Sequence, residues 1–481
     1  MEFYRLMAFK FFFPFLFLIS GIYPQSSLNV QNKIDELLQD QFFNSTLIAA
    51  DIYNLSKQEV IYQRNEKMLL HPASNMKILT STAAALFLGE NYKFQTSLYY
   101  TGKILNGTLY GDLYVAGGLD PDFTTGDLDS LISIISLLKI NEITGKIIGD
   151  VSVKDSLFWG KGWMWDDDPS ADAPYLSALN INKNCIKVLI KGKKTDDHAE
   201  IILQPPTGYV TTINTCTVIP AYEKDSVTID RDWINRKNTL LIKGTVKKTL
   251  EPDTVSAEKI LNLFEPEKYF LTLLRERLDA KKISGKKDIA LNKIPRYAVR
   301  IFTFERTIDS VIVNMNKISD NLSAEMLLYA LGGKDTVKPA SEEAGLKLVD
   351  SLIALSGFNP GNYKLADGSG VSRYNLVSAE LLLGILKFIY GHPEIFNLIY
   401  KSFPAAGVDG TLKTRMISTA AENNVHAKTG ELNGVNALSG YLNSAGGDLI
   451  AFSILIQNYT GPSAQAQFFI DEICRILTKE Y

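Results

Sequence analysis

The chain has 481 residues, of which 46% are hydrophobic and 21% are charged, as is ordinary for a globular protein of about two to four domains. Its formal net charge of −3 and its short basic runs argue against nucleic acid as a partner. The three cysteines and four histidines lack the spacing of a metal site, so we expect no metal and no cofactor.

Residues 1–26 have the layout of a secretory signal peptide. Arg5 and Lys10 flank the start of an apolar run at 11–19, and small and polar residues follow it. The run is too short to cross about 30 Å of hydrocarbon. We therefore predict export to the periplasm or cell envelope, with an uncleaved anchor and peripheral membrane association as the alternative.

The remaining pattern predicts helices and strands at both ends of the chain and a β-rich middle. The expected helices are 29–41, 128–139, 323–333, 378–391 and 463–479, and one that starts at 271–278. The expected β segments are 46–65, 94–118, 143–155, 185–255, 297–304 and 438–459. The tryptophan-rich segment 159–170 has no regular period and predicts a structured loop.

This distribution predicts one α/β core that is interrupted by an insertion. We expect 27–92 and 296–481 to form the core, and 93–295 to form two nested smaller domains, the inner one at about 180–255. Cys185 and Cys216 could form a disulfide or remain two buried thiols.

Ser74 and Lys77 begin an apolar, alanine-rich segment and stand at positions i and i+3. Pro72 predicts that a helix starts near Ser74, which places both side chains on one face. A serine, an amine and the free N–H groups of a helix N-terminus are the minimum for acyl transfer. Ser284 and Lys287 repeat the spacing in a lysine-rich stretch without an apolar helix, so we discount them.

Two further motifs follow in order. Ser319-Asp320-Asn321 lies 245 residues after Ser74, and Lys428-Thr429-Gly430 lies a further 109 residues on. Taken singly, the first could be a helix cap and the second an ordinary edge strand. The ordered set SxxK, SxN and KTG is instead typical of class A β-lactamases and penicillin-binding proteins.

Over nearly the whole mature sequence the chain resembles the D-alanyl-D-alanine carboxypeptidase/endopeptidases, the class C low-molecular-mass penicillin-binding proteins. Besides the three motifs, the resemblance rests on GDLYVAGGLDPDF (111–123), GWMWDDD (162–168), LADGSGVSRYN (365–375), FPAAGVDGTLKTRM (403–416) and AKTGELNGVNALSGYL (427–442). It implies a transpeptidase/β-lactamase-like α/β core, an antiparallel sheet flanked by helices, with β-rich domains inserted between SxxK and SxN.

The resemblance also implies a serine peptidase that cleaves peptidoglycan stem peptides or cross-links and is inhibited by β-lactams. Ser74 would be the nucleophile and neutral Lys77 its base, with the Lys77 pKa lowered by burial and by the charge of Lys428. Ser319 would relay a proton to the leaving amine, and Asn321 would hold the substrate amide. Backbone N–H groups of Ser74 and residue 431 would form the oxyanion hole.

The remaining expected site residues bind substrate. Lys428, Thr429 and Gly430 would receive the terminal carboxylate. By motif, Asp167 and Arg373 would hold the ammonium and carboxylate of a diaminopimelate side chain, although an acidic turn and a surface ion pair are the alternatives. We expect 367–370 to shape the loop behind the site.

Position 431 departs from the family pattern, since it holds Glu431 where a small hydroxyl residue is usual, and Asn433 stands where a glutamine is usual. A carboxylate there should repel a free terminal D-alanine. We therefore predict weaker carboxypeptidase than endopeptidase activity.

Two other functions fit the motifs. A serine β-lactamase would need a carboxylate-activated water between SxxK and SxN, and we find no recognisable loop of that kind. A non-catalytic peptidoglycan-binding or scaffold protein would retain the fold without turnover. The sequence leaves the oligomeric state open.

Overall fold

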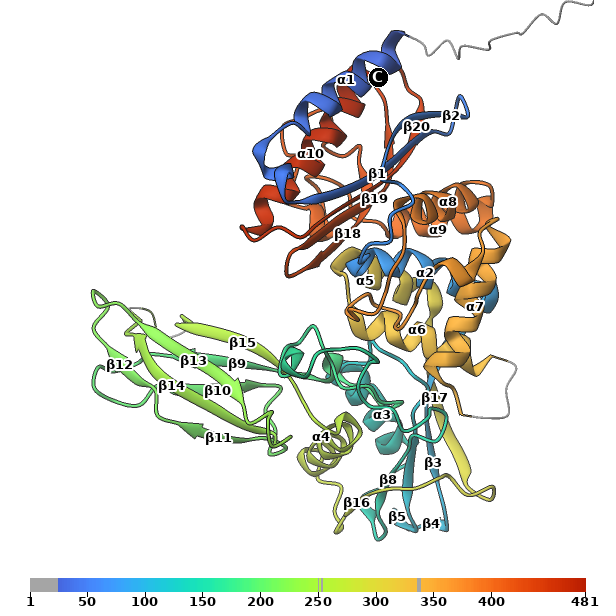
Figure 1. Cartoon of the computed structure of the whole chain (residues 1–481). Coiled ribbons are helices and arrows are strands. Elements are labelled where there is room, and N and C mark those ends of the chain that lie inside the picture. Colours follow the sequence, from blue (N-terminus) through green and yellow to red (C-terminus); the bar gives the residue numbers. More distant parts are fainter. Residues whose placement is uncertain (1–24, 250, 252–253, 335–338) are drawn as a thin grey trace, which may run out of the picture.

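The computed structural model describes residues 25–249, 251, 254–334 and 339–481 (Figure 1). The predicted signal peptide 1–26 lies outside the described residues except for its last two, which begin the first helix. Within the described ranges, no helix is both long enough and apolar enough to cross a membrane.

One five-stranded antiparallel sheet joins the two ends of the chain in the order β18-β19-β20-β1-β2. Its strands are β1 (Leu47–Asn54), β2 (Glu59–Arg64), β18 (His426–Leu432), β19 (Val435–Asn443) and β20 (Leu449–Gln457). The hairpins expected at 46–65 and 438–459 are confirmed. Because β1 pairs with β20, the first and last parts of the core form one continuous sheet.

Helices cover both faces of this sheet. α1 (Gln25–Leu37) and α10 (Ser463–Glu480) pack on each other over one face, and α8 (Ala379–Tyr390) lies on the other (Figure 1). Successive strand residues point to opposite faces of the sheet. Ile48 therefore packs on the face covered by α1 and α10, and Ala49 packs on the face covered by α8. This arrangement confirms the expected antiparallel sheet flanked by helices.

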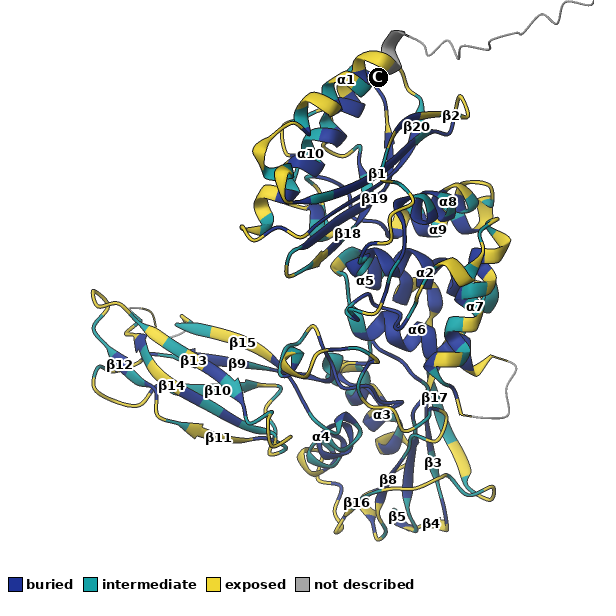
Figure 2. Cartoon of the chain, in the orientation of Figure 1, coloured by how far each residue is buried: buried dark blue, intermediate teal, exposed yellow. Residues whose placement is uncertain are grey.

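The helices below the sheet surround α2 (Met76–Leu88), whose first turn carries the lysine of the SxxK motif. They are α5 (Ile308–Ile318), α6 (Asn321–Gly333), α7 (Glu342–Leu355), α8 and α9 (Pro393–Ser402). Every residue of α2 from Met76 to Ala84 is buried, and Figure 2 shows α2 and α6 as largely buried ribbons. A helix with no polar face belongs in a protein interior. Lys77, in its first turn, is therefore placed away from water.

The insertion begins with a second five-stranded sheet, in the order β16-β8-β6-β3-β17. Its strands are β3 (Lys93–Tyr100), β6 (Leu113–Ala116), β8 (Ile147–Asp150), β16 (Ile289–Leu291) and β17 (Val299–Thr307), with α3 (Thr125–Leu137) and α4 (Pro266–Ala280) packed beside it. A small sheet of β4 (Lys103–Leu105), β5 (Thr108–Tyr110) and β7 (Glu142–Ile143) accompanies them.

The pairing of β17 changes the expected boundary at residue 296. The sequence pattern places that segment in the core, whereas β17 hydrogen-bonds to β3 along most of its length and so is part of the insertion's sheet. The chain returns to the core only where α5 begins. We therefore propose 93–307 as the inserted region.

The inner part of the insertion is entirely β-structured and extends away from the core (Figure 1). Its strands are β9 (Cys185–Lys191), β10 (Glu200–Gln204), β11 (Thr211–Asn214), β12 (Thr217–Ile219), β13 (Ser226–Arg231), β14 (Thr239–Lys247) and β15 (Ala257–Asn262). They form the sheets β10-β9-β15 and β11-β14-β12, with β13 on β14. We propose this segment as the inner nested domain.

Short 3₁₀ turns complete the fold. They are η1 (Gln41–Asn44), η2 (Ala73–Asn75), η3 (Trp165–Asp167), η4 (Asn182–Asn184), η5 (Pro360–Asn362) and η6 (Gly410–Leu412). The expected helix 29–41 ends earlier, at Leu37, because the Asp40 side chain caps η1 by accepting a hydrogen bond from Phe42 N. The segment 159–170 is irregular apart from η3, as expected.

The structure favours buried free thiols over a disulfide between Cys185 and Cys216. Cys185, Cys216 and Cys474 are all buried free thiols, and burial raises the pKa of each. Cys185 lies in β9, whereas Cys216 lies just before β12 in the other sheet.

We expect a brief exposure to Ellman's reagent to leave the native protein unlabelled, because the thiols are buried and protonated. Unfolding in guanidinium without reductant should release all three thiols. Release of one thiol until a reductant is added would instead indicate a Cys185–Cys216 disulfide.

Candidate active site

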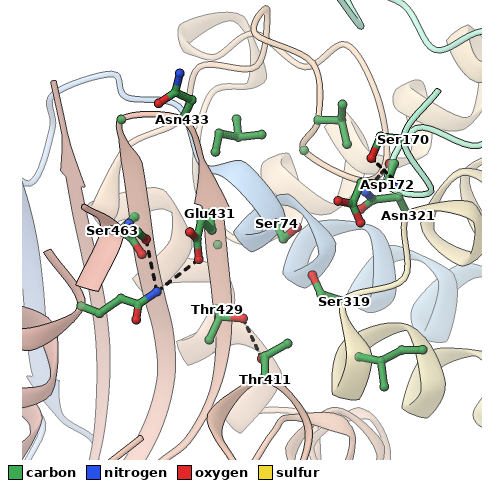
Figure 3. Close-up of a pocket in the computed structure, with 18 of the residues that line it drawn as sticks. Ser74, Ser170, Asp172, Ser319, Asn321, Thr411, Thr429, Glu431, Asn433 and Ser463 are labelled. Carbon is green, nitrogen blue, oxygen red and sulfur yellow. Dashed lines mark hydrogen bonds between the residues drawn. The ribbon is translucent and has the colours of Figure 1, made fainter. Parts of the chain in front are cut away.

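A cleft of about 780 Å³ opens where the edge strand β18, the helices below it and the insertion meet (Figure 3). Its lining includes seven of the ten expected site residues: Ser74, Asp167, Ser319, Asn321, Thr429, Gly430 and Glu431. Lys77 and Lys428 lie behind this surface and hydrogen-bond to residues on it. Arg373 stands at one side. Segments separated by hundreds of residues thus meet in one place.

Ser74 lies in the turn η2, immediately before α2, and Lys77 lies in the first turn of α2. The Lys77 amine is 2.9 Å from the Ser74 hydroxyl oxygen. Ala73, just before the serine, has a φ of +46°, a conformation that costs a non-glycine residue about 1 kcal/mol. The Ser74 hydroxyl and the Lys77 amine thus lie side by side, as the spacing of the motif predicts.

The Gly370 backbone packs directly against Ala73. Gly370 has a φ of +90°, and a Cβ there would lie 1.8 Å from the Ala73 carbonyl oxygen. Only glycine permits this approach. The DGSG segment therefore fixes the position of the turn that carries Ser74.

Three oxygen atoms surround the Lys77 amine. It donates to the Ser74 hydroxyl, to Asn321 Oδ1 at 2.6 Å and to the Ser369 carbonyl at 2.7 Å. The side chain is fully buried, and burial lowers the pKa of Lys77 to about 8, although the charges of Asp367 and Glu325 oppose this effect. With this pKa, about one tenth of the Lys77 amines are neutral at pH 7.

Lys428 and Ser319 form a second pair of amine and hydroxyl. The Lys428 amine lies 2.9 Å from Ser319 Oγ and donates also to the Thr429 carbonyl at 2.9 Å. Burial, and next the charge of Lys77, lower the Lys428 pKa well below its ordinary value. The sequence predicted that Lys428 would depress the pKa of Lys77. The structure gives the effect of one lysine on the other for Lys428, whereas the Lys77 pKa is lowered by burial and raised by nearby carboxylates.

The SxN motif both caps a helix and lines the cleft, so a capping role and a place in the site are compatible. Ser319 ends α5 in a left-handed conformation, with a φ of +61°. Asp320 caps α6 by accepting a hydrogen bond from Ser323 N at 2.8 Å. Asn321 then donates from Nδ2 to the Asp172 carbonyl of the insertion at 2.6 Å. This bond orients Oδ1 toward Lys77.

Behind the site, Asp367 organises the loop that supports Lys77. It accepts hydrogen bonds from Trp163 Nε1, Ser369 Oγ, Gly370 N, Ser372 N and Asn375 Nδ2. Glu325, also fully buried, accepts from Ser369 N at 2.8 Å, and burial raises its pKa strongly. The expectation that 367–370 shapes this loop rather than reacts agrees with these contacts.

On the β18 side, Thr429 Oγ1 lies 2.7 Å from Thr411 Oγ1, so two hydroxyls stand together at the cleft wall (Figure 3). A Cβ at Gly430 would lie 2.8 Å from both Asn75 Nδ2 and the Pro72 carbonyl. This contact explains why the motif ends in glycine. Glu431 is exposed on the cleft and accepts a hydrogen bond from Gln467 Nε2 at 3.2 Å.

Asp167 and Arg373 lie at the edge of the site, and within the described part of the chain neither side chain hydrogen-bonds to the three motifs. Asp167 lines the cleft, and burial raises its pKa, which the Met164 N–H and the charge of Arg373 offset only in part. Arg373 is not part of the lining and donates to the Asn433 carbonyl at 3.1 Å. Its role in substrate binding stays a prediction.

Several residues of the cleft had no expected role: Asp172, Thr411, Arg415 and Gln467. Arg415 pairs with Asp471 of α10, with Nη2 and Oδ1 2.5 Å apart. Thr411 and Arg415 lie in the stretch 403–416, which resembles the family, and this resemblance could have indicated them as site residues. Asp172 accepts a hydrogen bond from Asn321 with its backbone carbonyl and its charge raises the pKa of Lys77, and no motif indicates these contacts. Among the described residues, no group of three or more His, Cys, Asp or Glu could hold a metal ion.

A serine beside a buried amine, faced by a second pair of hydroxyl and amine beneath an antiparallel sheet, defines the class of penicillin-binding serine enzymes. A family model described as the D-Ala-D-Ala carboxypeptidase 3 (S13) family matches residues 30–479. The chain belongs to this family, and the resemblance stated from the sequence is confirmed.

Known proteins support the same assignment. D-alanyl-D-alanine carboxypeptidase DacB of Haemophilus influenzae is 30% identical over 410 residues, which cover 85% of this chain and 84% of that protein. The D-alanyl-D-alanine carboxypeptidase of Actinomadura sp. strain R39 is 28% identical over 452 residues, covering 91% and 82%.

The crystal structure of penicillin binding protein 4 from H. influenzae is similar, with a TM-score of 0.80, 28% identity and coverage of 92% of this chain and 97% of that one. A structure of that protein complexed with a β-lactam has a TM-score of 0.76.

The lowered Lys77 pKa predicts a pH dependence. Only the neutral amine accepts a proton, and its fraction increases as the pH rises toward a pKa of about 8. We expect the second-order rate constant for acylation of Ser74 by a fluorescent β-lactam to rise about tenfold from pH 6 to pH 7 and to level off above about pH 8.

The matched control is Lys77→Arg, since a guanidinium stays protonated at all these pH values and should abolish acylation throughout. A wild-type rate constant that does not change between about pH 6 and pH 9 would contradict Lys77 as the base.

Proposed function

We propose that this protein is a serine D-Ala-D-Ala carboxypeptidase and D,D-endopeptidase that cleaves peptidoglycan stem peptides or cross-links. The observation that carries the proposal is the fully buried Lys77 amine, 2.9 Å from Ser74 Oγ, with the Ser319–Lys428 pair in the same cleft. Its family membership supports the substrate class.

In the acylation step, neutral Lys77 takes the Ser74 proton while Ser74 Oγ attacks the carbonyl carbon between two D-residues. The backbone N–H groups of Ser74 and Glu431 stabilise the oxyanion of the tetrahedral intermediate. The C–N bond then breaks, and the leaving amine receives a proton through Ser319. The products of this step are an acyl-serine and a free amine.

Deacylation reverses the proton movements. Water attacks the acyl-serine carbonyl and loses a proton to the amine network, and Ser74 leaves as a restored hydroxyl. Asn321, held by Asp172 and Lys77, is positioned to bind the substrate amide. Lys428 and Thr429 offer a cation and a hydroxyl to a substrate carboxylate.

We further propose that the protein works in the periplasm or cell envelope, where peptidoglycan lies. Residues 1–26 support export by their signal-peptide pattern, and peptidoglycan is absent from the cytoplasm. β-Lactams should acylate the same serine, as the β-lactam complex of the related H. influenzae protein suggests.

Labelling with a fluorescent penicillin tests the nucleophile. We expect a stable label on the wild type and none on Ser74→Ala, because the acyl bond forms at Ser74 Oγ. Ser284→Ala, at the discounted second SxxK pattern, is the matched control and should label fully. Rapid loss of the wild-type label would indicate a β-lactamase, and an unlabelled wild type would indicate a non-catalytic protein.

Glu431 is the residue that we propose to weaken carboxypeptidase relative to endopeptidase action. Its carboxylate is exposed on the cleft, two positions along β18 from Thr429. Gln467 is neutral, so its hydrogen bond orients Glu431 without cancelling the charge. A substrate carboxylate near Thr429 is therefore repelled, whereas a cross-linked dimer has a second stem whose contacts can offset the repulsion.

We expect Glu431→Gln to raise kcat/KM for a stem pentapeptide with a free terminal carboxylate about three- to tenfold, which corresponds to removal of about 1 kcal/mol of repulsion. The same pentapeptide with a terminal amide is the control substrate and should change little. Equal gains on both peptides would show that Glu431 does not act through charge.

A further inference from the structure

A second cleft, of about 360 Å³, brings together all four tryptophans of the chain. It is lined by Phe158, Trp159, Trp163, Trp165, Asp168, Tyr175, Trp233, Ile234 and Arg236. One wall comes from residues 158–175 of the insertion, and the other is the turn between β13 and β14 of its inner part. The cleft is thus mostly aromatic, with one carboxylate and one guanidinium.

Two of the rings are exposed, Phe158 at 40% and Trp165 at 70%, whereas Trp163 and Tyr175 are buried at the base of the cleft. The Trp165 ring centroid lies 4.9 Å from that of Trp233 on the opposite wall. Deeper in, Trp159 lies 5.3 Å from Trp163 and 5.0 Å from Tyr175, centroid to centroid. Large aromatic side chains dominate binding energetics, so rings left exposed around a hollow indicate a ligand surface.

Buried polar contacts hold the two walls together. Arg231 of β13 forms an ion pair with Asp168, and both side chains are almost fully buried. The Tyr175 hydroxyl donates to the other oxygen of Asp168 at 2.7 Å, and Arg231 also donates to Asn262 Oδ1 at 2.9 Å. A site that is fixed before binding loses less conformational freedom on binding.

This aromatic cleft shares a wall with the candidate active site. Asp167 lines the active-site cleft, while the next residue, Asp168, lines the aromatic cleft. Trp163 Nε1 donates at 2.9 Å to Asp367, which organises the loop behind Lys77. The two clefts therefore lie on either side of this segment.

We propose that the aromatic cleft binds a pyranose ring of the N-acetylated amino sugars that carry the stem peptide, an inference that rests on the proposed function. The C–H faces of a pyranose are apolar and stack on the electron-rich faces of indole rings. The exposed Arg236 guanidinium lies 5.3 Å over Phe158 at the cleft and can donate hydrogen bonds to the sugar's acetamido carbonyl. A free peptide lacks such flat, hydroxylated rings.

The kinetic test compares a stem pentapeptide with the same pentapeptide attached to its disaccharide. We expect the wild type to have a KM about tenfold lower for the disaccharide pentapeptide, and Trp233→Ala to lose this advantage while its KM for the bare peptide stays unchanged. Tyr222→Ala removes an aromatic ring that is 87% exposed in the inner domain but outside the cleft, and should behave as wild type.

The binding test uses the disaccharide without peptide, added to Ser74→Ala protein and followed by tryptophan fluorescence. Saturable binding that Trp233→Ala weakens about tenfold would support the sugar site even if the peptidase activity proposed above were absent. No saturable binding, or equal KM values for the two substrates in the wild type, would overturn it. Failure of the penicillin label would instead count against the proposed function alone.

Discussion

Two lysine side chains are buried with their amines in one crevice, and the arrangement of the rest of the site depends on this. Lys77 and Lys428 are both fully buried, and each is within hydrogen-bonding distance of a serine hydroxyl. Burial favours the neutral form of both amines, and for Lys428 the charge of Lys77 adds to the effect. An ordinary lysine, which holds its proton at neutral pH, becomes a base at a cost in folding stability.

Hydrogen bonds from the Lys77 amine offset part of this loss of folding stability. Its amine has three acceptors, one each from its own turn, from α6 and from the loop that Asp367 organises. Glu325 and Asp367 hold that loop from below and oppose the fall of the Lys77 pKa. The pKa of about 8 is thus the result of burial working against nearby carboxylates.

The insertion contributes residues to the candidate active site. Asp172 orients Asn321 through its backbone carbonyl, and Lys183 forms an ion pair with Asp320 at 2.8 Å. Asp167 reaches the cleft from the same region. The segment 159–172 therefore lies between the candidate active site and the aromatic cleft. Through it, residues of the insertion contact the active-site residues of the core.

The sequence by itself determined the three motifs and most elements, because these follow from local spacing and from the period of apolar residues, whereas the antiparallel core was implied by the resemblance to a known family. Ser74 and Lys77 illustrate this, since three residues along one turn bring their side chains together whatever surrounds them. Only the tertiary structure decided that β17 pairs with β3, that Cys185 and Cys216 stay apart, and that Asp172, Thr411 and Gln467 meet the motifs. Those contacts join residues whose partners are chosen by the packing of whole sheets and helices, and no local pattern encodes that choice.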